Sequence, residues 1–155
     1  MDESSPNTDI DKGFVAILDV LGFGRLSEQD QSAVASVLEH TIDRLLPMFD
    51  SMSSDTVTGR LKSTKFRMFS DTIVIAFPRE PNGAVNQDMF HFISDYLGSL
   101  FCLLLDQNIP LRGAVGYCTI VEGKYGIYGK AVVDAKYEYE ATSWAGIHYN
   151  LLSLT

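Results

Sequence analysis

Two aspartates, Asp19 and Asp71, stand where a pair of carboxylates could carry out metal chemistry. Asp19 follows the apolar run 14–18, and a carboxylate at the end of a buried strand is costly unless it is paired or binds a cation. Asp71 lies between two runs of β-branched and aromatic residues, where a tight hairpin is expected. Each aspartate alone is most simply a helix cap or a turn residue. Together they would form an oxygen site suited to Mg²⁺ or Mn²⁺, ions that are usually shared with substrate phosphates.

A glycine-containing turn follows Asp19 directly. Gly22 and Gly24 flank Phe23, and an apolar pattern of helical spacing starts a few residues later. Backbone N–H groups in such a turn, together with the start of a helix, favour the binding of phosphate groups. A Gly-x-Gly pair alone is weak evidence, so its interest lies in its place beside Asp19.

Other catalytic patterns are absent from the sequence. It has no Gly-x-Ser-x-Gly, Cys-x-x-Cys or Walker-type motif, which gives hydrolase, redox and P-loop functions little support. Cys102 and Cys118 fall within apolar patterns and are expected to be reduced core thiols. The histidines at positions 40, 91 and 148 fall on separate expected elements, without metal-ligand spacing.

Asp19 and Asp71 lie far apart in the sequence, so the fold must bring their two segments together. Runs of apolar residues predict strands, and apolar residues at helical spacing predict amphipathic helices. The resulting order, β, α, β, β, α, β, β, α, β, predicts an α+β fold with helices packed against a mixed or antiparallel sheet, as in a ferredoxin-like palm. In such a sheet the end of the first strand and the tip of the first hairpin can lie side by side. We expect strands at 14–18, 65–70, 72–77, 111–121, 125–128 and 146–149, helices at 31–50, 89–105 and 131–143, and turns at 70–71 and 123–124.

The composition is that of one globular domain. The chain has 155 residues, of which 46% are hydrophobic and 21% charged, enough for one core but not for two. We expect a flexible lead-in at 1–12, a folded domain at 13–155, and a mobile surface loop at 50–64. The sequence ends soon after a strand-like run, which leaves open whether further residues follow Thr155.

Charge and hydropathy restrict the partners of the protein. A net charge of −8 argues against broad electrostatic binding to nucleic acid or to an anionic membrane. No apolar run reaches the roughly 18 residues of a membrane span. The N-terminus is acidic and polar, unlike a signal peptide, so we expect a cytoplasmic protein with neither nucleic acid nor membrane as a partner.

Four segments, taken together, resemble the motifs of class III nucleotidyl cyclases. FVAILDVLGFGRL (14–26) is similar to the first metal motif of that family. FSDTIVIAF (69–77) is similar to the second, with Ser70 where most members have Gly. The order and spacing of the four are more specific than any one motif. RGAVG (112–116) and YGKAVVDA (128–135) resemble the later strand and helix motifs, so the resemblance spans about residues 13–149.

The resemblance implies a metal-dependent enzyme that cyclises a nucleoside triphosphate. Asp19 and Asp71 would bridge two divalent cations, Mn²⁺ or Mg²⁺, and the carbonyl of Val20 would complete one coordination shell. The resemblance also implies a head-to-tail homodimer with shared active sites. One chain would supply the aspartates, and the other would supply the base pocket.

Several residues are candidates for binding the substrate. By resemblance, Gly22, Phe23 and Gly24 would hold the β and γ phosphates. Lys130 is a weaker candidate, because a lysine in the first turn of a helix is usually solvated. Arg112, which follows Pro110 at a strand start, is also a weaker candidate.

Four positions differ from the purine-specific members of the family. Arg67 and Gly126 stand where those members read adenine with Lys and Asp. Val133 and Tyr137 stand where Asn and Arg assist the transition state. Arg67 is therefore a candidate for contacting the base and Tyr137 for a catalytic role; a surface arginine and a packed tyrosine are the alternative interpretation. An arginine donor favours uracil, with its two carbonyls, over the amino edge of cytosine.

Within this family, the chain looks most like the bacterial pyrimidine cyclases of the Pycsar antiphage systems, which make cyclic UMP or cyclic CMP. Three segments carry this resemblance: SDTIVIAF (70–77), LRGAVG (111–116) and GKAVVDA (129–135). The main hypothesis is a uridylate cyclase that makes a second messenger in antiphage defence. One alternative is a CTP-specific cyclase. Another, motivated by the missing Asn and Arg, is a catalytically silent cyclase-homology domain that dimerises or binds nucleotide. A diguanylate cyclase is disfavoured because no GGDEF-like tract is present.

Overall fold

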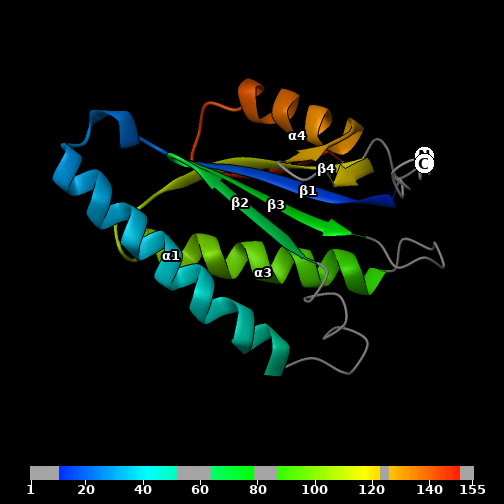
Figure 1. The fold of residues 1–155 in the computed structure, drawn as a ribbon, viewed down its shortest axis with the longest axis horizontal. Helices are drawn as coiled ribbons and strands as arrows, with labels where there is room; N and C mark the ends of the chain where they lie inside the picture. The colour runs from blue at the N-terminus through cyan, green and yellow to red at the C-terminus, as the bar shows by residue number, and fades with distance from the viewer. Residues whose placement is uncertain (1–10, 52–63, 79–86, 123–125, 151–155) are drawn as a thin grey trace, which may run out of the picture.

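The computed structural model describes residues 11–51, 64–78, 87–122 and 126–150. These residues form a mixed β-sheet with helices on both faces (Figure 1), so the predicted α+β class is confirmed. No helix of these ranges is long and apolar enough to cross a membrane. The strands are β1 (Asp11–Val20), β2 (Lys65–Phe69), β3 (Thr72–Pro78), β4 (Leu111–Glu122), β5 (Ile127–Tyr128) and β6 (Gly146–Asn150); the helices are the short 3₁₀ helix η1 (Phe23–Arg25), α1 (Glu28–Ser51), α3 (Gln87–Leu105) and α4 (Lys130–Ala141).

The first strand of the chain lies at the centre of the sheet. The strand order is β2-β3-β1-β4-β5, and β6 also pairs with β4. β1 is antiparallel to both β3 and β4, whereas β6 is parallel to β4. Because β1 has a partner on each side and a helical layer on each face, all of residues 14–18 are buried, as their continuous apolar pattern predicts.

Alternate residues of β1 contribute to two different cores. Phe14 and Leu18 pack with buried side chains of α1 and α3. Val15 and Ile17 pack with two alanines of α4 on the other face. Figure 1 shows the same arrangement, with α1 and α3 on one side of the sheet and α4 on the other. The sheet is therefore the middle layer of three.

Helix α4 approaches β4 closely at Gly116. A Cβ atom at this position would lie 2.5 Å from the carbonyl oxygen of Ala131 and 2.8 Å from the amide nitrogen of Ala135. Both are backbone atoms, which cannot move without moving the helix. Glycine at 116 therefore sets the distance between α4 and the sheet.

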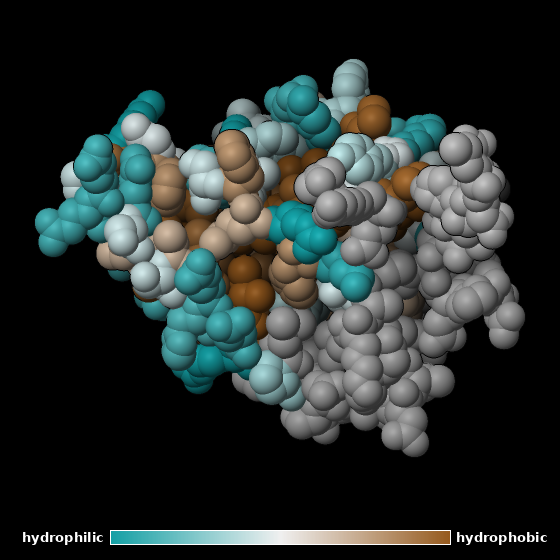
Figure 2. Space-filling model, viewed as in Figure 1, coloured by the Kyte–Doolittle hydropathy of each residue, from teal (hydrophilic) through white to brown (hydrophobic). Residues whose placement is uncertain are grey.

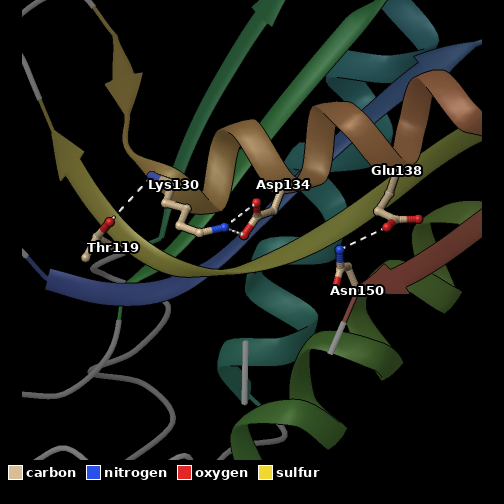
Figure 3. Close-up of polar contacts among 5 residues, drawn as sticks. All are labelled: Thr119, Lys130, Asp134, Glu138 and Asn150. Carbon is tan, nitrogen blue, oxygen red and sulfur yellow. Dashed lines mark hydrogen bonds and ion pairs between the residues drawn. The ribbon is translucent and has the colours of Figure 1, made fainter. Parts of the chain in front are cut away.

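Polar contacts anchor both ends of α4 to the sheet (Figure 3). At the N-terminal end, the backbone N–H of Lys130 donates to Oγ1 of Thr119 on β4, at 3.4 Å. Toward the C-terminal end, Nδ2 of Asn150 on β6 donates to a carboxylate oxygen of Glu138, at 2.9 Å. These contacts determine which part of α4 lies over which strand.

The starts of two elements differ by three residues from the sequence prediction, and the other boundaries in the described ranges differ by two residues or fewer. β1 begins at Asp11, so the last two residues of the predicted lead-in, Asp11 and Lys12, belong to the strand and pair with β4. α1 begins at Glu28, three residues before its predicted start, because Oγ of Ser27 accepts the backbone N–H of Asp30 at 3.2 Å and caps the helix. In both places polar residues extend an element beyond its apolar pattern. Asp50 and Ser51, predicted as the start of the loop at 50–64, belong to α1 instead. The rest of the lead-in, residues 52–63 of that loop and the turn at 123–124 lie outside the described residues.

Tyr96 supports a prediction about alkaline stability. Its side chain lies in the core between α3 and the sheet, and burial raises the pKa of Tyr96 well above its ordinary value of 10.0. Above about pH 10 the unfolded chain releases this proton while the folded chain keeps it. Stability that is complete below that pH is therefore lost above it, by up to about 1.4 kcal/mol per pH unit.

We expect Tyr96→Phe to flatten this alkaline fall in stability. The measurement is the urea midpoint as a function of pH from about 9 to 11. Tyr128→Phe, which changes a tyrosine that is 55% exposed, is the control. A Tyr96→Phe protein that loses stability as steeply as the wild type would contradict the prediction.

Candidate functional site at the end of the central strand

The end of β1 lies beside the turn that carries Asp71. The backbone N–H of Val20 donates to the carbonyl oxygen of Asp71 at 3.1 Å. This bond extends the β1–β3 register, in which Asp19 pairs with Thr72. The segments that carry the two aspartates are therefore neighbours in space, although about fifty residues separate them along the chain.

A two-residue turn, Ser70 and Asp71, connects β2 to β3. Phe69 and Thr72 pair across this turn, which makes the tight hairpin expected from the sequence. Ser70 has a φ of 57°, in the left-handed region that glycine adopts most readily. The side chain of Phe69 is 85% exposed beside this turn.

Asp19 shares one face of the sheet with Arg112. The two residues pair across β1 and β4, so their side chains project to the same side. Nη2 of Arg112 donates to Oδ2 of Asp19 at 3.2 Å. The side chain of Asp19 is only 13% exposed. The guanidinium therefore compensates a carboxylate that would otherwise be costly at the end of a buried strand.

The C-terminal end of α4 holds Arg112 from the other side. Nη2 of Arg112 also donates to the hydroxyl oxygen of Tyr139 at 3.1 Å, and Nη1 donates to the carbonyl oxygen of Thr142 at 3.3 Å. The guanidinium carbon lies 4.8 Å from the centre of the Tyr139 ring, within the range of a cation–π contact. Asp19, Arg112 and Tyr139 thus form one connected polar cluster.

The ionisation of this cluster follows from its contacts. Burial lowers the pKa of Arg112, but its hydrogen bonds to Tyr139 and Asp19 outweigh that effect and raise it. Burial, and then the hydrogen bond to Asp19, raise the pKa of Tyr139, against the opposing effect of Arg112. At neutral pH the cluster therefore contains a cationic guanidinium and a neutral phenol.

The glycine turn follows the cluster directly along the chain. Gly22 has a φ of 81°, and Cβ atoms built on Gly22 or Gly24 would meet no atom within 4 Å, so the surface of the turn is open. Phe23 between them is buried and anchors the turn to the core. Among the described residues, the backbone N–H groups of residues 22–24 donate no hydrogen bond to a backbone carbonyl in a turn or loop. These N–H groups could therefore donate to an anion such as a phosphate.

Arg67 lies on the edge strand β2, two strands from β1. Its register pairs it with Val74, which in turn pairs with Ile17, so all three stand in one row across the sheet. The side chain is exposed and lines a cavity of about 310 Å³ between α1 and the edge of the sheet. In Figure 2, hydrophobic side chains are visible at the middle of the face where α1 and β2 lie next to each other. The other residues that line this cavity are Glu39, Ile42, Asp43, Phe66, Met68 and Ile73.

Lys130 and Tyr137 lie apart from the cluster. Nζ of Lys130 pairs with both carboxylate oxygens of Asp134, at 2.6 and 2.7 Å (Figure 3), and that hydrogen bond raises the pKa of Lys130. Thr119, which contacts the backbone of Lys130, is seven positions from Arg112 on β4, or about 23 Å along a strand. Tyr137 is 73% exposed. Lys130 is therefore too far along the sheet to reach Asp19 of the same chain, and the side chain of Tyr137 projects into solvent rather than onto the buried face that carries Tyr139.

Sequence analysis missed Tyr139 and Thr142. The available signal was the spacing of Ala131, Ala135 and Tyr139, which lie four residues apart and so share one face of α4. The two alanines are completely buried against the sheet, and Tyr139 continues their row toward the end of β1. A phenol that continues the row of buried alanines was a recognisable candidate.

The donors at this site are oxygen atoms. Asp19, Asp71 and the carbonyl of Val20 are oxygen groups of the kind that Mg²⁺ and Mn²⁺ prefer as ligands. No group of three or more His, Cys, Asp or Glu side chains within the described ranges is arranged to hold a metal ion. A cation bound by the two aspartates would take its remaining ligands from the backbone, water or a substrate.

No protein-family model matches this chain, and no curated protein matches it in a sequence search.

Proposed function

We propose that this chain is a metal-dependent nucleotidyl cyclase that converts UTP to 3′,5′-cyclic UMP and pyrophosphate. The observation that carries the proposal is the backbone contact between Val20 and Asp71, which brings two acidic segments together at the end of a buried strand. The open glycine turn at residues 22–24 adjoins them. By the resemblance of its motifs, the product would be a second messenger in antiphage defence.

The topology supports the palm predicted for this family. The strands β2-β3-β1-β4 are antiparallel to their neighbours, and α1 and α3 pack on the same face. This is the order of a β-α-β-β-α-β ferredoxin-like unit. The left-handed φ of Ser70 adds support, because most members of the family have glycine at this position of the motif.

The residues of the site fit the divalent cations that the reaction would need. Asp19 and Asp71 would hold the cations, and the carbonyl of Val20 would add a neutral oxygen ligand. Bound there, the cations would polarise the α-phosphate and lower the pKa of the 3′-hydroxyl. The N–H groups of residues 22–24 would hold the β and γ phosphates, and Arg112 would add positive charge beside them.

The reaction balances without a further reagent. The 3′-oxygen forms a bond to the α-phosphorus, while the bond from the α-phosphorus to the oxygen that bridges to the β-phosphate breaks. Pyrophosphate leaves with the electron pair of that bond, and the 3′-hydroxyl proton passes to water. The contribution of the chain is to hold the triphosphate in line with the attacking oxygen.

The remaining candidate residues act in this proposal across a homodimer. Val133 and Tyr137 are 64% and 73% exposed and lie one helical turn apart on α4, so they form a stripe. Since Lys130 is remote from Asp19 of its own chain and the side chain of Tyr137 is exposed to solvent, the proposal assigns the catalytic role of Tyr137 and the substrate-binding role of Lys130 to the site of a second copy. Arg67 on the exposed edge strand would contact the base.

The test is incubation with each of the four nucleoside triphosphates and Mn²⁺, with products identified by mass spectrometry. We expect cyclic UMP as the main product. If Arg67 donates to a uracil carbonyl, Arg67→Ala should lower the preference for UTP over CTP by about tenfold, measured as the ratio of the two kcat/KM values. A wild-type preference for CTP or ATP, or an unchanged ranking in Arg67→Ala, would contradict this assignment of Arg67.

A catalytically silent domain is the second candidate, and the ion pair between Asp19 and Arg112 favours it. This pair offsets the buried carboxylate without any metal, so Asp19 could be kept for stability alone. A silent domain would give no cyclic product from any of the four nucleotides, whereas a cytidylate cyclase would give cyclic CMP. The same incubation therefore separates the three functions.

A further inference from the structure

Tyr139 belongs to the polar cluster of Asp19, Arg112 and Tyr139, but neither the family motifs nor the proposed reaction gives it a role. The guanidinium of Arg112 has three partners: the carboxylate of Asp19, the hydroxyl of Tyr139 and the carbonyl of Thr142. Only the first belongs to the sheet; the other two belong to the end of α4. Arg112 therefore has anchors that do not depend on Asp19.

This division matters because Asp19 is the proposed ligand of a cation. A cation that arrives at Asp19 competes directly with Arg112 for the same carboxylate. An arginine held by Asp19 alone would then lose its only side-chain partner and recover the rotamer freedom of a long side chain. The hydroxyl and ring of Tyr139 contact the guanidinium in this same position, with the hydroxyl oxygen 3.1 Å from Nη2 and the ring centre 4.8 Å from the guanidinium carbon, so they can hold it there without Asp19.

We propose that Tyr139 is a positioning residue that keeps Arg112 at the site when Asp19 binds a cation. Asp19 can then bind the cation while Arg112 contacts the triphosphate. The ring fixes the plane of the guanidinium, and the hydroxyl fixes its rotation in that plane. The inference rests on the proposed cyclase function, and it assigns Tyr139 no contact with the substrate.

Two substitutions separate the roles of the hydroxyl and the ring. Tyr139→Phe keeps the ring over Arg112 and removes the hydrogen bond, whereas Tyr139→Leu removes both. We expect KM for UTP to rise about tenfold in Tyr139→Phe and further in Tyr139→Leu, with kcat changing less than KM. Tyr128→Phe, on β5 and 55% exposed, is the matched control and should leave both constants unchanged.

A binding measurement provides a readout other than turnover. UTP that lacks the 3′-hydroxyl cannot cyclise, so calorimetry with 3′-deoxy-UTP and Mn²⁺ reports binding alone. We expect its Kd to be about tenfold weaker for Tyr139→Phe than for the wild type. In an Arg112→Ala background, Tyr139→Phe should cause no further loss, because its effect passes through Arg112.

Each outcome decides the proposal. Additive losses in the double variant, or an unchanged Kd in Tyr139→Phe, would overturn the role of Tyr139 while leaving the cyclase function intact. A wild-type protein that neither binds 3′-deoxy-UTP nor cyclises any nucleotide would overturn both. Circular dichroism and thermal unfolding of every variant check that the losses occur in folded protein.

Discussion

Replacing Asp19 or Asp71 by alanine is expected to lower the turnover of the proposed cyclase reaction about a thousandfold or more. In the proposed function each substitution removes one of the two carboxylates that would hold the cations, and several kcal/mol of transition-state stabilisation would depend on those cations. The backbone bond between Val20 and Asp71 does not involve either side chain, so the two segments should stay together in both variants.

The variants need a check on folding because Asp19 also pairs with Arg112. Asp19→Asn keeps an oxygen that can accept from Nη2 of Arg112 and removes the charge, so it should be inactive but well folded. Asp106→Ala, at an exposed aspartate after α3, is the control and should retain full activity. Activity is measured as cyclic product per minute with Mn²⁺, and folding by circular dichroism. Near-normal turnover in Asp19→Asn or Asp71→Ala would exclude the metal role of that aspartate.

The second large effect is expected from Gly116→Ala. The new Cβ would lie 2.5 Å from the carbonyl oxygen of Ala131 and 2.8 Å from the amide nitrogen of Ala135. The clash can be relieved only by moving α4 away from β4, which would also open the core under the helix and shift Tyr139. We expect a loss of about 3 kcal/mol or more in the free energy of unfolding.

Gly98→Ala is the matched control for this substitution. Gly98 lies within α3, and a Cβ there would meet no atom within 4 Å. Because alanine favours a helix over glycine, this variant should be more stable, by up to about 1 kcal/mol. Urea unfolding of both variants at neutral pH measures the two changes. A Gly116→Ala protein with the midpoint of the wild type would mean that α4 does not lie as close to β4 as described.

Much of the fold could be predicted because local patterns follow burial. The run 14–18 is apolar at every position since β1 is covered on both faces, and α3 shows its core face as a regular helical spacing. The starts of β1 and α1 could not be predicted in this way. At Asp11 and Lys12 the strand depends on backbone pairing with β4, and at Ser27 the helix depends on a polar cap.

The candidate site was predictable where it depends on the backbone and less so where it depends on packing. The proximity of Asp19 to Asp71 follows from a hairpin next to the first strand, which sequence order allows. The partners of Arg112 depend instead on where the end of α4 lies over the sheet. That position is set by Gly116 and by contacts among residues far apart in the chain, so no local pattern contains it.

The central position of β1 has a consequence for the synthesis of the protein. Its two partners, β3 and β4, come much later in the chain, and Phe14 pairs with Tyr117. At a ribosomal rate of 5 to 20 residues per second, the apolar strand emerges roughly 5 to 20 s before its last partner. During that interval it is an unpaired, hydrophobic edge, the kind of segment that chaperones bind and that nascent chains aggregate through. The central strand of the finished sheet is therefore a segment of the nascent chain that we expect chaperones to bind during synthesis.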